Sequence, residues 1–303
     1  MKQKHPENII KLSIFQNIRN FIINSSLIGG VLLSSSTYAI TQQEIEGYKR
    51  LADQGDGYYQ VIVGQIYTFG LGVKTDKEEA TRYFKRAQSQ GDAETQYQIG
   101  RVFDTGLLGD INHKEALSWF KKAAKQKHVE SMYQVGRYYQ EGLSVDPNPK
   151  RAYSWFEKAA KKDHVKAAYQ VGIMNRYDVD LINYEKAALF LAQASFKFHI
   201  KATHELGLLY YYGLGVPKDK ERAFELFLDA SGYLYGESFY YLAVSAVNGE
   251  GTEQSYGDAY YYLLRSQQYA IEDEFNLQSF LKEKLDAQTL IDAHLRYQAE
   301  NGG

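Results

Sequence analysis

The sequence predicts an all-α fold: an α/α superhelical solenoid of about six helix-turn-helix repeats of 36 residues, followed by a C-terminal capping helix region. Two rows of residues predict it. The first is a small residue that recurs at intervals of 36, 36, 36, 35 and 36 positions: Gly64, Gly100, Gly136, Gly172, Gly207 and Ala243. The second is a residue whose side-chain oxygen can cap the start of a helix: Asp76, Asn112, Asn148, Asn183, Asp219 and Ser255.

A third row gives each repeat its second helix. Every capping residue is followed by an alanine four positions later and then by a pair of large apolar residues, which together make one apolar helical face. The alanines are Ala80, Ala116, Ala152, Ala187, Ala223 and Ala259. Each repeat is therefore predicted to contain helix A around the small residue, a turn, and helix B around the alanine.

The recurring glycine is predicted to lie inside helix A, where it costs about 1 kcal/mol relative to alanine. This cost is explained if a neighbouring helix approaches closely at that point. The glycines of "GLGV", from Gly70 to Val73, and of "GLGVPKD", from Gly213 to Asp219, are predicted to end helix A in a left-handed conformation. A phosphate-binding loop is excluded because no strand precedes these glycines and no Lys-Ser/Thr follows them.

The first 39 residues are typical of a secretory signal peptide. Four basic residues precede an apolar stretch from Phe21 to Leu33, and small residues follow up to Ala39, near which we expect cleavage. The apolar stretch is shorter than the roughly 20 residues of a spanning helix, so the mature chain is expected to have no stable membrane span. Cleavage and retention of the segment as an anchor both stay open. A periplasmic or secreted location follows from this prediction.

The remaining chain is divided into three predicted parts. Residues 40–56 form an N-terminal capping helix, and residues 57–270 form the six repeats. Residues 271–303 form one or two C-terminal capping helices and a tail, with Asp286 at the start of the second helix.

Composition excludes several classes of function. The 303 residues are 44% hydrophobic and 24% charged, as in an ordinary folded protein, and the net charge of −2 argues against nucleic acid as a partner. Removing residues 1–39 leaves 31 basic and 36 acidic residues, a net charge of −5. The chain contains no cysteine, which excludes disulfides, thiol catalysis and cysteine-based metal sites.

The segment "AETQYQIGRVFDTG…NHKEALSWFKKAA", from Ala93 to Ala124, and its copy from Val129 to Ala160 resemble the Sel-1-like repeat family, a relative of the tetratricopeptide repeats. The resemblance covers about residues 57 to 270. It implies a right-handed superhelix of helix pairs that binds proteins or peptides, often as an adaptor for membrane-associated complexes.

No constellation of residues predicts catalysis, a metal or a cofactor. His128, His164 and His199 share one repeat position, but successive repeats stack about 10 Å apart, so these side chains cannot converge on one ion. Asp56 and Asp92 occupy the same position in earlier repeats, which indicates a role at a helix start or in a turn. Some Sel-1-like proteins resemble β-lactamases, but those relatives carry a cysteine pair in each repeat, and this chain has none.

Binding residues are expected on helix A. Counted from the recurring small residue, positions −2 and +1 are expected to be more exposed than the rest of the helix. This face runs through Ile62, Gln65, Gln98, Arg101, Gln134, Arg137, Gln170, Ile173, Glu205, Leu208, Tyr241 and Val244. The predicted partner-binding residues are Gln98, Arg101, Gln134, Arg137, Gln170, Ile173, Arg176, Tyr177, Glu205, Leu208, Tyr212 and Tyr241. For Tyr212 and Tyr241, partner binding and repeat packing both stay open.

The fourth repeat departs from the pattern. Only 11 residues separate Gly172 from Asn183, whereas the other repeats have 12, and "RYDVD", from Arg176 to Asp180, replaces the glycine turn. A tolerated change in a surface loop and a partner-specific loop or bend are both compatible with this difference.

Together these observations predict a non-enzymatic periplasmic scaffold or adaptor that binds an envelope protein, with type VI secretion as a natural setting. The alternative is an immunity or inhibitor protein for a secreted toxin. The sequence leaves the oligomeric state open.

Overall fold

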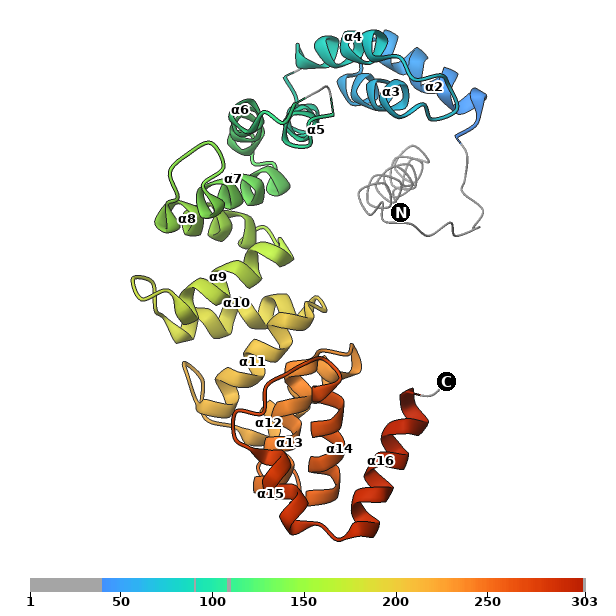
Figure 1. Ribbon diagram of the computed structural model, residues 1–303. Helices are drawn as coiled ribbons and strands as arrows, with labels where there is room; N and C mark the ends of the chain where they lie inside the picture. Colours follow the sequence, from blue (N-terminus) through green and yellow to red (C-terminus); the bar gives the residue numbers. More distant parts are fainter. Residues whose placement is uncertain (1–39, 90, 108–109, 302–303) are drawn as a thin grey trace, which may run out of the picture. The chain divides into compact units, whose positions relative to one another are not determined.

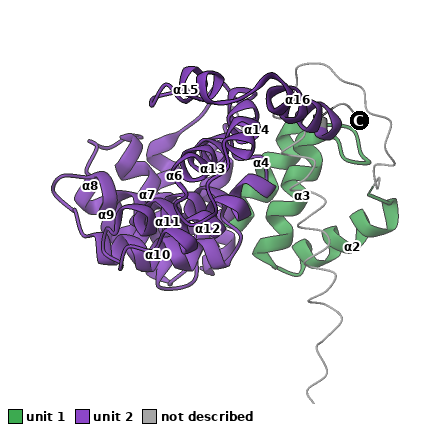
Figure 2. Ribbon diagram, turned by 90° about the horizontal axis from the view of Figure 1, so that it is seen from below, with its two compact units in different colours: residues 1–90 green, residues 91–303 purple. Residues whose placement is uncertain are grey.

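The computed structural model describes residues 40–89, 91–107 and 110–301. The predicted signal peptide and the last two glycines of the predicted tail lie outside these residues. The chain divides into an N-terminal body, residues 1–90, and a C-terminal body, residues 91–303, which Figure 2 colours separately and which are described one at a time below.

The described residues of both bodies are helical and contain no strand. The N-terminal body contains α2 (Gln42–Asp53), α3 (Gly57–Phe69) and α4 (Lys77–Gln88). The C-terminal body contains α5 (Ala93–Asp104), α6 (His113–Lys125), α7 (Val129–Glu141), α8 (Pro149–Ala160), α9 (Val165–Tyr177), α10 (Tyr184–Phe196), α11 (Ile200–Tyr212), α12 (Lys220–Gly232), α13 (Gly236–Asn248), α14 (Tyr256–Gln267), α15 (Leu277–Lys284) and α16 (Ala287–Asn301). The predicted six pairs of helices A and B are confirmed as α3/α4, α5/α6, α7/α8, α9/α10, α11/α12 and α13/α14.

The predicted capping row starts every helix B. In each repeat the side chain of the capping residue accepts a hydrogen bond from a backbone N–H in the first turn; the caps are Asp76, Asn112, Asn148, Asn183, Asp219 and Ser255. These bonds satisfy donors that have no partner inside the helix. The start of each helix B is thus encoded by a single residue.

The three histidines that share a repeat position start helices A of repeats three to five, as predicted. Nδ1 of His128, His164 and His199 accepts the backbone N–H three residues later at 3.2, 3.0 and 3.2 Å. An accepting Nδ1 requires the neutral ring with its proton on Nε2. Nε2 of His128 then donates to Glu94 at 3.1 Å, which joins α7 to α5.

The recurring glycine lies against a large side chain of helix B, as predicted. A Cβ atom built on Gly136 would lie 2.6 Å from the ring of Phe156, and one on Gly100 would lie 2.7 Å from Phe120. Repeats one, four and five show the same close approach to Phe84, Leu191 and Phe227. Because glycine has a hydrogen atom in place of a side chain, helices A and B can pack this closely in these repeats.

Repeat four keeps this helix pair although its turn is shorter. Helix α9 is followed by the capping residue Asp178, whose φ of −81° and ψ of 115° are extended. Helices α7 and α11 are followed by Gly142 and Gly213, with φ of 73° and 71°. The missing residue therefore removes the left-handed glycine turn and leaves the two helices intact.

The repeats end in two helices. Asp286 accepts the backbone N–H of Thr289 at 2.7 Å, which confirms the predicted start of α16. Helix α16 packs on α14 through ion pairs from Arg265 to Glu300 at 2.6 Å and from Arg296 to Asp258 at 2.8 Å.

A buried histidine lies between the last two A helices. His204 of α11 is 4% exposed, and its Nδ1 is 2.9 Å from the hydroxyl of Ser238 on α13. Its ring contacts those of Phe227, Tyr235 and Tyr241. Burial, together with the charge of Arg176, lowers the pKa of His204 to about 3.

We expect Gly136→Ala to destabilise the protein. Alanine gains up to about 1 kcal/mol of helix propensity, but its methyl group would meet the ring of Phe156, and overpacking of this kind costs about 1–3 kcal/mol. Denaturant unfolding followed by circular dichroism should show a net loss of about 1 kcal/mol, the middle of the range of about 0–2 kcal/mol that the two terms leave.

The control for this experiment is Gly232→Ala, because a Cβ atom on Gly232 meets nothing within 4 Å. This variant should be neutral or more stable than the parent. Adding Phe156→Leu to Gly136→Ala recreates the pair Ala243 and Leu263 of repeat six and should recover part of the loss. Equal stability of Gly136→Ala and the parent would contradict this explanation of the glycine row.

Acid should destabilise the protein through its buried histidines. An unfolded histidine binds a proton near pH 6.5, whereas the folded pKa of His204 is about 3 and that of His199 is lowered mainly by burial. The unfolded chain therefore binds more protons below pH 6.5, and the free energy of unfolding falls as the pH falls. For His204 the loss at pH 5 is about 2 kcal/mol.

Unfolding at pH 7.5 and pH 5 measures this effect, and a comparison with a variant that lacks His204 separates it from the glutamates that begin to titrate near pH 5. Tyr97, Tyr133 and Tyr169 occupy the repeat position of His204 in earlier repeats, so tyrosine fits this position. The variant His204→Tyr should therefore lose much less stability between pH 7.5 and pH 5 than the parent does. Substitution of the exposed His294 by glutamine should leave the loss unchanged. A parent protein with the same stability at both pH values would refute the assignment.

Candidate functional site

The predicted exposure of positions −2 and +1 on helix A is only partly correct. Arg101, Gln134, Arg137, Gln170, Ile173, Glu205 and Tyr241 are half-buried. The prediction is wrong for five residues, which are buried: Ile62, Gln65, Gln98, Leu208 and Val244. Within the C-terminal body the reason is that A helices of successive repeats lie side by side, as the bond from His128 to Glu94 shows, and cover residues along the shared edge.

In repeats two and three, three of the four predicted binding residues bond to neighbours on their own helix: Gln98, Gln134 and Arg137. Gln98 donates to Glu94 at 2.7 Å. Arg137 donates to Gln134 at 2.9 Å and forms two bonds of 3.0 Å with Glu141. Gln170 of repeat four accepts a bond from Gln140 at 3.3 Å. The polar groups of this half of the face are thus largely used within the fold.

Three predicted residues are brought together between α9 and α11. Arg176 donates to the carboxylate of Glu205, and the hydroxyl of Tyr177 donates to the same oxygen at 3.1 Å. The side chains of Arg176 and Glu205 are 9% and 15% exposed. Burial and the charge of Glu205 raise the pKa of Tyr177 to about 12. The group is a closed ion pair that joins the two helices.

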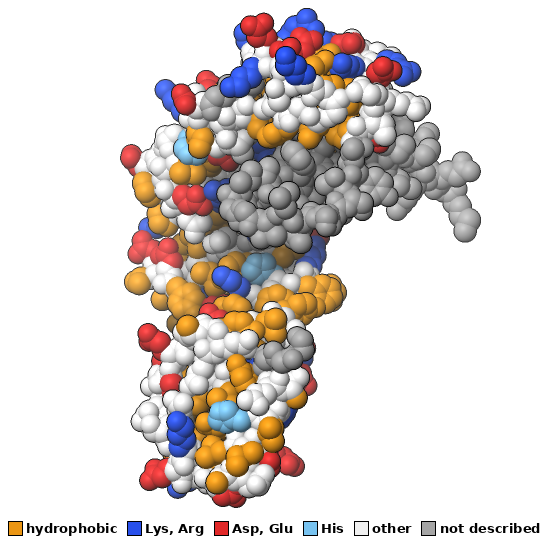
Figure 3. All heavy atoms as spheres, turned by 45° about the vertical axis from the view of Figure 1, so that its right-hand side comes forward, with side chains coloured by type: hydrophobic (Ala, Val, Ile, Leu, Met, Phe, Trp, Pro, Cys, Tyr) orange, Lys and Arg blue, Asp and Glu red, His pale blue; other side chains and the backbone are white. Residues whose placement is uncertain are grey.

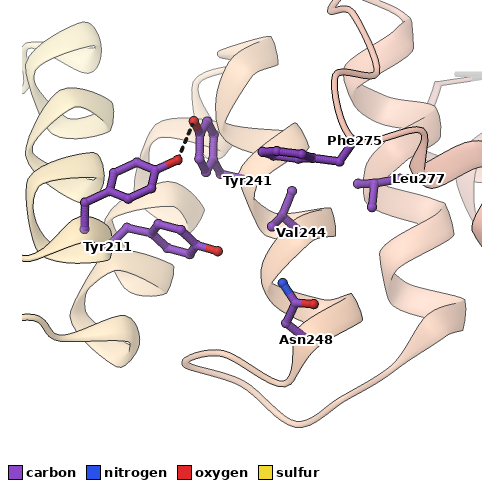
Figure 4. Close-up of a pocket in the computed structure, with 7 residues that line it drawn as sticks. Tyr211, Tyr241, Val244, Asn248, Phe275 and Leu277 are labelled. Carbon is purple, nitrogen blue, oxygen red and sulfur yellow. Dashed lines mark hydrogen bonds between the residues drawn. The ribbon is translucent and has the colours of Figure 1, made fainter.

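Tyr212 and Tyr241 meet at a pocket on α11 and α13. Their hydroxyl oxygens are 3.3 Å apart, and Tyr212 is 48% exposed. The pocket has a volume of about 350 Å³ and is lined by Tyr211, Tyr212, Tyr241, Val244, Asn248, Phe275 and Leu277 (Figure 4). We call it the aromatic pocket.

Three structural elements position the lining of the aromatic pocket. Tyr211 and Tyr212 form the last turn of α11, before the left-handed Gly213. Tyr241, Val244 and Asn248 share one side of α13, Phe275 comes from the segment that leads into α15, and Leu277 is the first residue of α15 (Figure 4). The spacing of three and four residues on α13 places its side chains on one helical face.

Contacts behind the aromatic pocket fix its far wall. The backbone N–H of Phe275 donates to the hydroxyl of Tyr240 at 2.8 Å, and the two rings stack with centroids 6.1 Å apart. The carboxylate of Asp273 accepts the N–H groups of Leu277 and Gln278 at 2.8 Å. The segment before α15 is therefore held to α13 by both stacking and hydrogen bonds.

Charges lie at one edge of the aromatic pocket. Lys220 is 2.8 Å from Glu250 and 3.0 Å from the centroid of the Tyr211 ring. Tyr211 donates to Glu250 at 2.5 Å. Burial acts to raise the pKa of Glu250, but the bonds from Lys220 and Tyr211 outweigh it and lower this pKa. Burial raises the pKa of Tyr211 and Tyr241, so both phenols are neutral near pH 7.

The aromatic pocket combines apolar walls with a few polar atoms, a composition typical of sites for bulky apolar groups. The phenol hydroxyls and the amide of Asn248 supply hydrogen-bonding groups. On the face that Figure 3 presents, hydrophobic and tyrosine side chains lie across the middle of the region of α11 to α16, and charged side chains lie mainly at its edges.

Besides the predicted Tyr212 and Tyr241, the lining contains Val244, which was placed on the helix A face but not among the binding residues, and four residues that sequence reasoning missed. Tyr211 and Asn248 precede the glycines that end α11 and α13, a signal that could have placed them beside Tyr212 and Tyr241. Phe275 and Leu277 carry no repeat signature, and no pattern in the sequence connects them with α13.

Within the described residues, no group of three or more His, Asp or Glu side chains is placed to hold a metal ion. None of the helices in the same residues is long and apolar enough to cross a bilayer.

The Sel1 repeat family model matches residues 58–92, 93–128, 129–164, 200–231 and 233–266. These ranges cover more than half of the chain and omit the repeat with the short turn. None of the curated proteins matches the chain.

Solved structures share the fold. A protective antigen of uropathogenic Escherichia coli with an SLR fold aligns with a TM-score of 0.68 and 24% identity, over 85% of this chain and 56% of the antigen. This chain thus spans little more than half the length of the antigen. A Sel1 repeat protein from Oxalobacter formigenes aligns with a TM-score of 0.64 and 22% identity, over 79% of this chain and 71% of that protein.

An immunity protein of Pseudomonas aeruginosa aligns with a TM-score of only 0.35, at 16% identity over 84% of this chain and 83% of that protein, which is too low for the likeness to bear on function. The family match and the six helix pairs lead to one conclusion: the chain belongs to the Sel1 repeat family.

Proposed function

We propose that the protein is a non-enzymatic scaffold that binds a partner protein, and that the aromatic pocket receives a bulky apolar side chain of that partner. The observation that carries the proposal is the meeting of three tyrosines with Phe275 and Leu277 around a space of about 350 Å³. Tyrosine is enriched at binding hot spots because it offers a large contact area and a polar tip.

The contacts of the predicted site residues favour the last repeats as the centre of binding. Gln98, Gln134 and Arg137 are engaged on their own helices, and Arg176 is closed against Glu205. Tyr212 is the most exposed of the lining tyrosines, and the contact recorded for its hydroxyl among the described residues is the phenol of Tyr241, at the long distance of 3.3 Å. A partner side chain that displaces this contact would cost little hydrogen-bond energy and would gain free energy from the burial of apolar surface.

The location and partner class follow from residues 1–39. Their basic, apolar and small-residue order supports export, so we propose a periplasmic or secreted protein whose partner is an envelope or secreted protein. An adaptor in a secretion system such as type VI is the first candidate. An immunity protein for a secreted toxin would use the same pocket, and the identity of the partner separates the two roles.

Photo-crosslinking tests the proposal in the native host. We expect a crosslinking amino acid at Tyr212 of the full-length protein to form an adduct with one abundant partner, which mass spectrometry identifies. The same amino acid at Ile111, an exposed residue in the turn after α5, is the control and should give no such adduct. Adducts from Ile111 and none from Tyr212 in a folded protein would place the binding surface elsewhere.

Substitution of Tyr212 tests whether the aromatic pocket is the recognition site. Tyr212→Arg would place a charge among apolar walls and should reduce capture of the identified partner at least tenfold at an unchanged melting temperature. Tyr212→Phe keeps the ring and should reduce capture less than threefold. If both variants capture the partner as well as the parent does, the pocket is not the recognition site.

A further inference from the structure

A further row of residues lies at the turns that follow helix B in repeats two to six. Five residues at one repeat position have a left-handed backbone: Lys127, Asp163, Phe198, Leu234 and Ala270, with φ of 65°, 66°, 60°, 62° and 56°. Each N–H in this row bonds back to the end of its helix, for example Phe198 to Ser195 at 2.8 Å. Glycine usually occupies such a position, because a side chain is strained there.

Repeats four and five place large apolar side chains on these turns. Phe198 is 76% exposed and Leu234 is 56% exposed, and their neighbours Phe196 and Tyr233 are 85% and 61% exposed. Packing within the fold does not explain these residues, because most of their surface meets solvent. Exposed apolar residues in a strained backbone point to a function outside the fold.

The turns of repeats two to four also carry exposed lysines. These are Lys125, Lys127, Lys161, Lys162, Lys166, Lys197 and Lys201. Three acids lie among these lysines. Asp163 is exposed and lies 3.6 Å from Lys197, Glu157 lies 2.9 Å from Lys161, and Glu130 is half-buried against His164. Asp229 and Glu237 flank the turn of repeat five. Although the chain after residue 39 is acidic overall, this part of its surface is basic.

Hydrogen bonds place neighbouring turns side by side. Lys197 donates to the backbone oxygen of Asp163 at 3.3 Å, and Gln193 donates to that of Ala160 at 2.8 Å. The lysines and the four apolar side chains therefore follow one another along one edge of the stacked repeats, which we call the basic apolar edge. Figure 1 shows where α10 ends, and at the same height in Figure 3 hydrophobic side chains project from the right-hand side of the molecule.

We propose that the basic apolar edge docks on the surface of an anionic lipid bilayer. Phe196, Phe198, Tyr233 and Leu234 enter the headgroup region, and the lysines contact lipid phosphates. Apolar insertion combined with attraction of lysines to anionic lipid is sufficient for peripheral binding. A row of turn tips at one repeat position suits a flat surface better than a single extended peptide, which would need a groove. The edge lies apart from the aromatic pocket, so the two proposals stand independently.

A fluorescent label tests insertion, and the absence of cysteine in the chain makes a single label possible. Gly232→Cys places an environment-sensitive fluorophore beside Tyr233 without removing an apolar residue, because a side chain at Gly232 meets open space. Asp146→Cys, in the turn at the opposite end of its helix pair, is the control. Both variants are full-length, so residues 1–39 contribute equally.

We expect vesicles with 30% phosphatidylglycerol in phosphatidylcholine to shift the emission of the Gly232→Cys label to the blue. Pure phosphatidylcholine, and the Asp146→Cys label with either vesicle, should give no shift. Three results would overturn the proposal: no shift at Gly232→Cys, equal shifts from both labels, or an equal shift with neutral vesicles. The first would favour a protein as the occupant of the edge.

Asparagine substitutions separate lipid binding from stability. Asparagine tolerates the left-handed conformation better than phenylalanine or leucine, so Phe198→Asn with Leu234→Asn should keep or raise the melting temperature. The same pair of substitutions should weaken vesicle binding at least fivefold. Binding is measured as the emission shift of the label at Gly232→Cys during titration with vesicles. Ala270→Asn, at the same repeat position, is the matched control and should leave binding unchanged. Unchanged binding by the paired variant would contradict the proposal.

Discussion

The contact between the glycine of helix A and the large side chain of helix B is the constraint on which the rest of the structure depends. In repeats one to five a glycine lies under Phe84, Phe120, Phe156, Leu191 or Phe227, with no space for a methyl group. Repeat six changes both partners, to Ala243 and Leu263, and both are buried. Repeat six thus pairs a larger residue on helix A with a smaller one on helix B, whereas repeat four keeps glycine beside leucine. In each of these pairs a small residue on helix A makes room for a large side chain of helix B, and this close fit sets the spacing within a repeat.

In the C-terminal body this spacing brings the A helices of successive repeats into one layer, whose contacts change along the chain. Histidine and glutamate join α5, α7 and α9, the buried pair of Arg176 and Glu205 joins α9 to α11, and His204 with Ser238 joins α11 to α13. At α11 and α13 tyrosines replace polar side chains, and the aromatic pocket opens there. The basic apolar edge arises from the same repetition, since one turn position recurs in every repeat.

Features encoded within one repeat could be predicted from the sequence. The capping residues such as Asn148 and the histidines such as His164 act at the start of their own helices, and the glycines act on the other helix of the same repeat, so their spacing was sufficient. The exposure of helix A was partly mispredicted because it depends on the neighbouring repeat, which covers Gln98 and Leu208. The wall of the aromatic pocket made by Phe275 could not be predicted, because it comes from a segment outside the repeat pattern.

The central claim is that the aromatic pocket is the recognition site, and the most direct test is a crystal structure of the protein with a peptide selected from a random library for binding to it. The account predicts that a bulky apolar side chain of the peptide lies against Tyr211, Tyr212 and Tyr241, with its backbone within hydrogen-bonding distance of Asn248. A peptide bound on α12 and α14, with the pocket empty, would contradict the claim.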